Sequence, residues 1–152
     1  VTARSATAIA TELAGMVTSH QIEAYIAFGI DPVDYLATPR FLGVTLSVFF
    51  LNLYFSTCGI IGPYVAAKFL NPTLAADYLT GLFQCIHVST VVISVIKSIV
   101  FGMIISITAT YYGFKVERSS TEIPVAGISA VTKSFVGIIF SDVALIAAFF
   151  SL

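Results

Sequence analysis

Tryptophan is absent from this sequence and charged residues are scarce. Charged residues make up 10% of the 152 residues, whereas 58% are hydrophobic, and the mean hydropathy is +1.00. An average soluble domain is about one quarter charged, so this composition indicates a protein that lies in lipid. The net charge of −1 gives no electrostatic basis for binding nucleic acid.

Motifs for covalent chemistry are also missing. The two cysteines, Cys58 and Cys85, lie in apolar stretches without the spacing of a disulfide framework or a zinc site. The sequence contains no P-loop and no GxSxG, HExxH or GxGxxG motif. We therefore assign no catalytic residue, metal site or cofactor, and do not expect an enzyme. The sequence opens at Val1 without a signal peptide, and we interpret it as part of a longer chain.

Three stretches are long and apolar enough to cross a bilayer. Residues 41–67 carry no charge, and 27 residues of helix extend about 40 Å, against about 30 Å of hydrocarbon. The stretch 78–114 is too long for one crossing. It is either one long helix or a short interfacial helix followed by a spanning part at about 88–112. A third spanning helix is expected at about 125–151. The fold class is therefore an all-α integral membrane protein with about three transmembrane helices in this fragment.

Residues 1–40 have a different character. They carry six of the fifteen charged side chains, and the apolar side chains of residues 3–28 follow a helical period. We predict one amphipathic helix over 3–28, ended by the turn at Gly29–Pro32. Most Lys and Arg residues outside the spans fall on one side, so the positive-inside rule places 1–40 and 113–124 in the cytoplasm.

Two ionisable residues interrupt the apolar helices. Lys97 lies 17 residues before Phe114, and Asp142 lies 17 residues after Val125. In an antiparallel helical hairpin both reach the same depth, about 25 Å from the ends joined by the loop. Since an isolated charge in lipid is costly, we predict that they face each other or share a polar cavity. They either contact a lipid headgroup or form a structural ion pair.

Further polar and small residues lie within the same helices. Asn52, in the middle of the first span, is expected to form an interhelical hydrogen bond. The long second apolar stretch carries small residues at every fourth position, which either allow close helix packing or line a groove for acyl chains. They are Thr90, Ser94, Ser98, Gly102, Ser106 and Thr110.

Several motifs together resemble the MlaE permease family over essentially the whole sequence. In chain order they are Ala10–Leu13, Gln21–Ala24, Gly29–Pro32, Tyr35–Leu36, Pro39–Arg40, Gly59–Gly62, Ile96–Gly102, Tyr112–Phe114, Ala126–Thr132 and Asp142. The match corresponds to the C-terminal portion of a family member. His20 departs from the pattern, because the family usually has Glu before the Gln at this point.

This resemblance implies the transmembrane permease subunit of an ABC transporter that moves phospholipid or a related lipid. It implies a homodimer in the bacterial inner membrane, or in an organelle envelope, with a cytoplasmic ATPase that binds ATP and Mg and a periplasmic Mce-type lipid-binding protein. The opening segment would include the coupling helix that docks into the ATPase. The implied coupling residues are Glu12, His20, Gln21, Glu23, Asp31 and Pro32.

Lys97, Asp142 and Asn52 are assigned either to the lipid pathway or to polar contacts within the membrane. The alternative function is a structural or assembly subunit of a larger membrane complex that transports nothing. Intramembrane charges favour the transporter, because a scaffold seldom needs them.

Overall fold

A computed structural model describes residues 2–70, 72–86, 88–116 and 119–150. These residues form helices and short connections, and no strand occurs among them. The elements are α1 (Thr2–Thr18), α2 (Gln21–Ala27), the π-helical turn η1 (Val33–Ala37), α3 (Thr38–Leu70), α4 (Pro72–Cys85), α5 (Val88–Phe114), the 3-10 turn η2 (Ser120–Glu122) and α6 (Ile123–Phe150).

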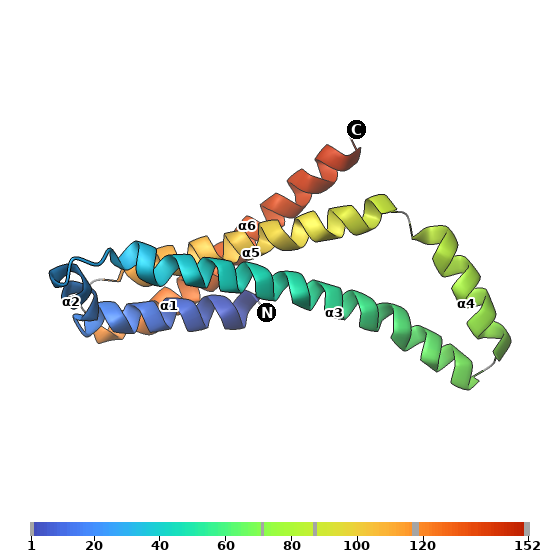
Figure 1. Ribbon diagram of the computed structural model, residues 1–152, viewed down its shortest axis with the longest axis horizontal. Coiled ribbons are helices and arrows are strands. Elements are labelled where there is room, and N and C mark those ends of the chain that lie inside the picture. The colour runs from blue at the N-terminus through green and yellow to red at the C-terminus, as the bar shows by residue number, and fades with distance from the viewer. Residues whose placement is uncertain (1, 71, 87, 117–118, 151–152) are drawn as a thin grey trace.

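Four long helices form an elongated bundle, in which α5 packs on α1, α3 and α6, and α1 also packs on α6 (Figure 1). Two ends can be distinguished. The α2 end carries α2, η1 and the connection between α5 and α6. At the α4 end, α3 and α5 diverge and α4 connects them. The chain thus passes from the α2 end to the α4 end through α3, returns through α5, and leaves again through α6.

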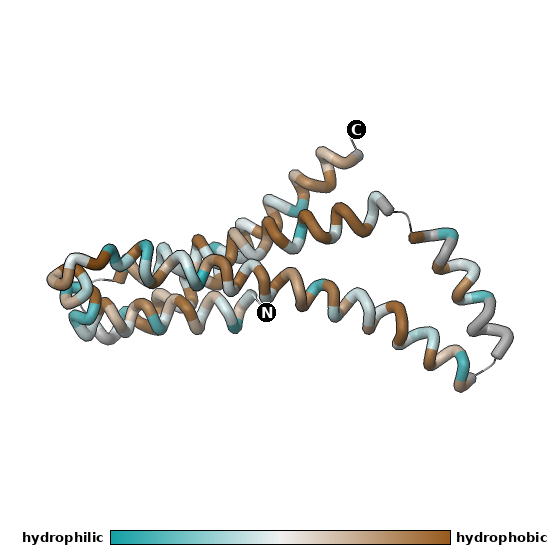
Figure 2. The backbone as a smooth tube through the Cα atoms, in the orientation of Figure 1, coloured by the Kyte–Doolittle hydropathy of each residue, from teal (hydrophilic) through white to brown (hydrophobic). Residues whose placement is uncertain are grey.

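Three helices have the length and apolarity to cross a membrane, as the sequence predicted. They cover Val33–Phe69, Ser89–Phe114 and Ile123–Phe149 among the described residues. The expected spans were 41–67, 88–112 and 125–151. Helices α3 and α6 begin two or three residues earlier than expected, α5 begins at the expected residue 88, and residue 151 lies outside the described part. Of the two alternatives for residues 78–114, the shorter helix leading into a spanning helix is correct. Apolar residues extend along α3, α5 and α6 (Figure 2).

The prediction of one helix over residues 3–28 is wrong. Helix α1 ends at Thr18, and His20 takes the left-handed conformation with φ 57° before α2 begins at Gln21. A left-handed residue cannot continue a right-handed helix, so the chain changes direction there. The expected region 1–40 is therefore not one structural unit, because α1 belongs to the bundle and only the following segment forms the α2 end.

Small side chains make the bundle compact on the side of α1. The buried cluster consists of Ala6, Ala10, Ile105, Ala109 and Ala130. At the contact of α5 with α1, a Cβ added to Gly113 would lie 2.7 Å from the Cβ of Leu13. Such close approach is how helices gain packing energy in lipid.

Helix α3 has no such contact at Gly59 and Gly62, where no described atom of another element lies within 4 Å of a Cβ built there.

Candidate functional site

Lys97 on α5 and Asp142 on α6 form an ion pair. Their Nζ and Oδ1 atoms lie 2.6 Å apart, and the side chains are 23% and 39% exposed. The prediction that these residues face each other is confirmed. The antiparallel course of α5 and α6 brings them to the same level, and each charge offsets the cost of placing the other among apolar helices.

Asn52 on α3 adds a polar group to the same region. Its Nδ2 donates to the hydroxyl of Ser94 at 3.0 Å and approaches the Ser94 carbonyl oxygen at 3.4 Å. The predicted interhelical hydrogen bond is confirmed, with α5 as the partner helix. Asn52 and Lys97 both line a cavity of about 360 Å³ between α3 and α5. Its other lining residues are Val48, Thr90, Ile93, Ser94, Ser98 and Phe101. The arrangement offers a cation, an amide and hydroxyls beside apolar side chains.

The row of small residues on α5 faces α3, and the close packing that the sequence allowed is confirmed at one position. At its centre the helices touch, because a Cβ added to Gly102 would lie 2.8 Å from the Cα of Thr45. Toward the α4 end, Thr90, Ser94 and Ser98 line the cavity that contains Lys97. Toward the α2 end, the row lines a second cavity. Close packing therefore holds at one position, and open space lies on either side of it.

The second cavity was not predicted. It has a volume of about 620 Å³ and lies between the α2-end parts of η1, α3 and α5. Its lining is mainly apolar, with Lys115 as its charged member, and the Nζ of Lys115 lies 5.8 Å from the ring centroid of Tyr111. The pattern of small residues in α5 suggested only Ser106 and Thr110, and the rest of the wall comes from residues 33–41 and from larger side chains between positions 107 and 115. The complete lining is Val33, Ala37, Thr38, Phe41, Ser106, Ile107, Thr110, Tyr111, Phe114 and Lys115.

Most of the residues assigned to coupling lie together at the α2 end. Gln21 opens α2 and is exposed. The Nδ1 atom of His20 lies 3.2 Å from Glu23 Oε2, and both side chains are more than half exposed. Asp31 has a structural role, because its Oδ1 accepts a hydrogen bond of 2.9 Å from the backbone nitrogen of Val33 and so caps the start of η1. Pro32 follows directly in helical geometry, as proline at a helix start does.

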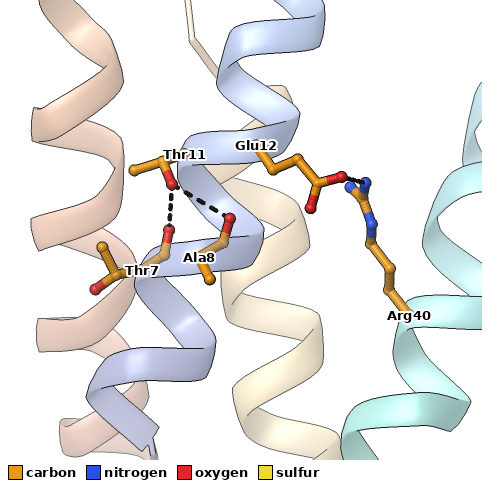
Figure 3. A network of polar contacts seen from close by, with 5 residues as sticks. All are labelled: Thr7, Ala8, Thr11, Glu12 and Arg40. Atoms are coloured by element: carbon orange, nitrogen blue, oxygen red, sulfur yellow. Dashed lines mark hydrogen bonds and ion pairs between the residues drawn. The ribbon is translucent and has the colours of Figure 1, made fainter.

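Glu12 lies elsewhere. Its carboxylate accepts a hydrogen bond of 2.8 Å from Arg40 Nη2, which connects α1 to the start of α3 (Figure 3). The family resemblance grouped Glu12 with the coupling residues, but the structure places it beside the bundle, eight residues before the turn at His20. The fold does not bring it together with the rest of that set.

Exposed apolar side chains surround α2, a feature that the sequence reasoning missed. Phe28 is 82% exposed, and Ile26 and Tyr35 are each about 60% exposed. A shallow hollow of about 390 Å³ beside them is lined by Ile26, Gly29, Ile30, Asp31 and Pro32. Clustered exposed apolar groups beside charged ones are typical of a protein interface. The helical period over residues 21–26 was visible in the sequence, but it did not show which of these apolar side chains stay exposed.

Comparison with known proteins agrees with this geometry. The family model described as Permease MlaE matches residues 1–148. A probable ABC transporter permease protein of Rickettsia prowazekii is 31% identical over 150 residues, which are 99% of this chain and 58% of that protein. A similar protein of Rickettsia typhi is 30% identical over 93% of this chain and 55% of its own length.

A plant protein is also similar. The chloroplastic protein TRIGALACTOSYLDIACYLGLYCEROL 1 of Arabidopsis thaliana is 31% identical over 99% of this chain and 43% of its own length. The chain thus spans about half the length of the curated relatives that it matches.

Proposed function

The chain belongs to the MlaE permease family, and on this premise we propose that it is the transmembrane subunit of an ABC transporter that moves phospholipid or a related lipid between membranes. The observation that carries the proposal is the family match over residues 1–148. Relatives named as probable ABC transporter permeases support the transporter class. The plant relative carries the name of a diacylglycerol lipid, which supports a lipid cargo.

The protein is a multi-pass membrane protein with three apolar helices long enough to span the bilayer in the described residues. We propose that it lies in the bacterial inner membrane, and the chloroplastic relative supports an organelle envelope as the alternative location. ATP hydrolysis is assigned to a separate cytoplasmic ATPase that holds ATP and Mg. A second copy of the chain and a periplasmic Mce-type lipid-binding protein complete the proposed assembly.

The polar cavity between α3 and α5 supports an amphipathic substrate. A phospholipid needs apolar walls for its acyl chains and polar groups for its headgroup, and both kinds of group line the cavity with Lys97 and Asn52. Lys97 already has Asp142 as its partner, with 2.6 Å between Nζ and Oδ1. A lipid phosphate could therefore approach Lys97 only by sharing it with Asp142.

The α2 end supports docking of the ATPase. It presents His20, Gln21 and Glu23 beside exposed apolar side chains, and an amphipathic surface of this kind fits a groove on a partner protein. The positive-inside rule places the same end in the cytoplasm, where nucleotide is available. The proposed docking surface consists of His20, Gln21, Glu23, Ile26, Phe28 and Tyr35, and Glu12 is not part of it.

Phe28→Ala tests this docking surface in the full-length protein co-expressed with its ATPase. Phe28 is 82% exposed, so its removal leaves the fold intact but takes away a large apolar contact. We expect at least a tenfold loss of co-purified ATPase and of lipid transfer between vesicles. Phe69→Ala is the matched control, because Phe69 is 89% exposed on the far end of α3.

Equal ATPase recovery with Phe28→Ala and wild type would refute docking through α2. If the wild-type complex binds ATPase but transfers no lipid, the transporter proposal fails and the scaffold function is correct.

A further inference from the structure

We propose that the Glu12–Arg40 pair is a positioning joint, which passes a displacement of α2 to the transmembrane bundle. The inference rests on the proposed function, since it concerns how the ATPase would act on the permease. Neither residue touches the partner in this proposal. Glu12 lies on α1 and Arg40 on α3, and Figure 3 shows their side chains extending toward each other between these helices.

The first support is the way in which the helices pack. Helix α1 packs on α5 and α6, and α3 packs on α5, but α1 and α3 make few contacts with each other. The bond of 2.8 Å from Arg40 Nη2 to Glu12 Oε1 therefore joins two helices that apolar packing leaves almost independent. Among the described residues, Glu12–Arg40 is the ion pair that joins α1 to α3.

The second support is the position of the pair relative to α2. The segment between residues 12 and 40 contains α2 and η1, and both ends of this segment enter the bundle next to the pair. Within the segment, the rings of Tyr25 and Tyr35 lie 5.6 Å apart, and Ile30 donates its N–H to the Tyr25 carbonyl at 3.0 Å. The α2 end is thus a small unit that is attached to the bundle through α1 and α3, and the Glu12–Arg40 pair connects these two helices.

The third support is the close packing of α1 on α6. The Thr11 side chain points away from Arg40. Its hydroxyl donates hydrogen bonds to the carbonyl oxygens of Thr7 and Ala8 (Figure 3). This orientation leaves its methyl group 3.0 Å from the position of a Cβ built on Gly127 of α6. A movement of Arg40 would reach α1 through Glu12, and α1 in turn packs closely on α6.

The exposure and geometry of the pair indicate that it contributes little to the free energy of unfolding. Arg40 is 17% exposed and Glu12 58% exposed, so water screens half of the pair. Only one of the two terminal guanidinium nitrogens is engaged, because the buried Nη1 has no hydrogen-bond partner among the described residues. A pair selected for stability would use the bidentate geometry that arginine offers. Removing this pair is therefore expected to change coupling far more than folding.

The test uses the full-length permease with its ATPase in liposomes of phosphatidylethanolamine and phosphatidylglycerol. The variants are Glu12→Gln, Arg40→Gln and the exchanged pair Glu12→Arg/Arg40→Glu, with Arg4→Gln as the control that removes a charge from α1 elsewhere. The measured quantity is the number of lipids transferred per ATP hydrolysed. We expect this ratio to fall at least threefold in both single variants, with unchanged unfolding temperature, and to recover at least half of its value in the exchanged pair. Arg40→Lys keeps the charge, and should retain the ratio if the exchanged pair does not fold.

A second measurement does not depend on transport. Hydrogen exchange at residues 21–35 of the purified permease, without ATPase, should rise severalfold in Glu12→Gln and Arg40→Gln but not in Arg4→Gln. Unchanged exchange, or an unchanged ratio in both single variants, overturns the joint. A wild-type complex that moves no lipid overturns the proposed function instead, while the exchange measurement still decides whether the pair holds the α2 end in place.

Discussion

Replacing Lys97 and Asp142 singly and together measures what their ion pair contributes. A lone charge at bilayer depth costs at least about 2.5–3.5 kcal/mol. The two side chains are 23% and 39% exposed, which lowers that cost. We therefore expect Lys97→Met to destabilise the protein by about 2 kcal/mol, because Asp142 is left without its cation. Asp142→Leu should cost about the same for the opposite reason. The double variant removes both charges, and should lie within about 1 kcal/mol of wild type.

The assay is unfolding of the full-length protein in detergent micelles, followed by lipid transfer with the ATPase. Lys133→Met is the control, because Lys133 is an exposed lysine on the same helix as Asp142. If the two single losses simply add in the double variant, the residues are not coupled and the reasoning is wrong. If the double variant is stable and still transports lipid, the pair only orients α5 and α6. If it is stable but inactive, the charges act on the substrate.

Two further predictions concern helix contacts. Gly113→Ala should destabilise the protein by about 1–3 kcal/mol, because the new Cβ would lie 2.7 Å from that of Leu13. Gly43→Ala, where nothing lies within 4 Å, should be neutral or slightly stabilising, and equal unfolding of both variants would contradict the close approach. Asn52→Leu should cost about 1 kcal/mol by loss of its interhelical hydrogen bond. In Thr57→Val only bonds within one helix are lost, so its unfolding should be nearly that of wild type.

Apolar length and the spacing of charges predicted much of the architecture. Residues that must cross lipid have to be apolar over at least about 20 positions, so the three spans could be identified without knowing their neighbours. The Lys97–Asp142 pair followed from counting residues to a shared loop, because helix rise is constant. Asn52 could be expected to find a partner in another helix, but not Ser94 in particular.

The place of α1 could not be predicted in the same way. Its buried face is made of Ala6, Ala10, Leu13 and Ala14, and alanine gives only a weak apolar signal. Such a pattern is typical of an amphipathic surface helix as well as of a helix packed through small residues. The turn at His20 contains no glycine or proline, so no local signal marked the end of α1. The partner of Glu12 lies 28 residues away and depends on how α1 and α3 are placed.

The contact between α3 and α5 makes α3 a lever with unequal arms. The two helices meet at Thr45 and again at Asn52, and α3 continues beyond α5 toward α4, which contacts it through a hydrogen bond of 3.2 Å from the Tyr78 hydroxyl to the Ile60 carbonyl. From Thr45 back to Thr38 the short arm is about 10 Å, and from Asn52 to Leu70 the long arm is about 27 Å. A tilt about this pivot that moves the short arm by one ångström carries the long arm more than twice as far in the opposite direction. A small push on the base of α3 would therefore become a larger displacement where α3 joins α4, together with α4.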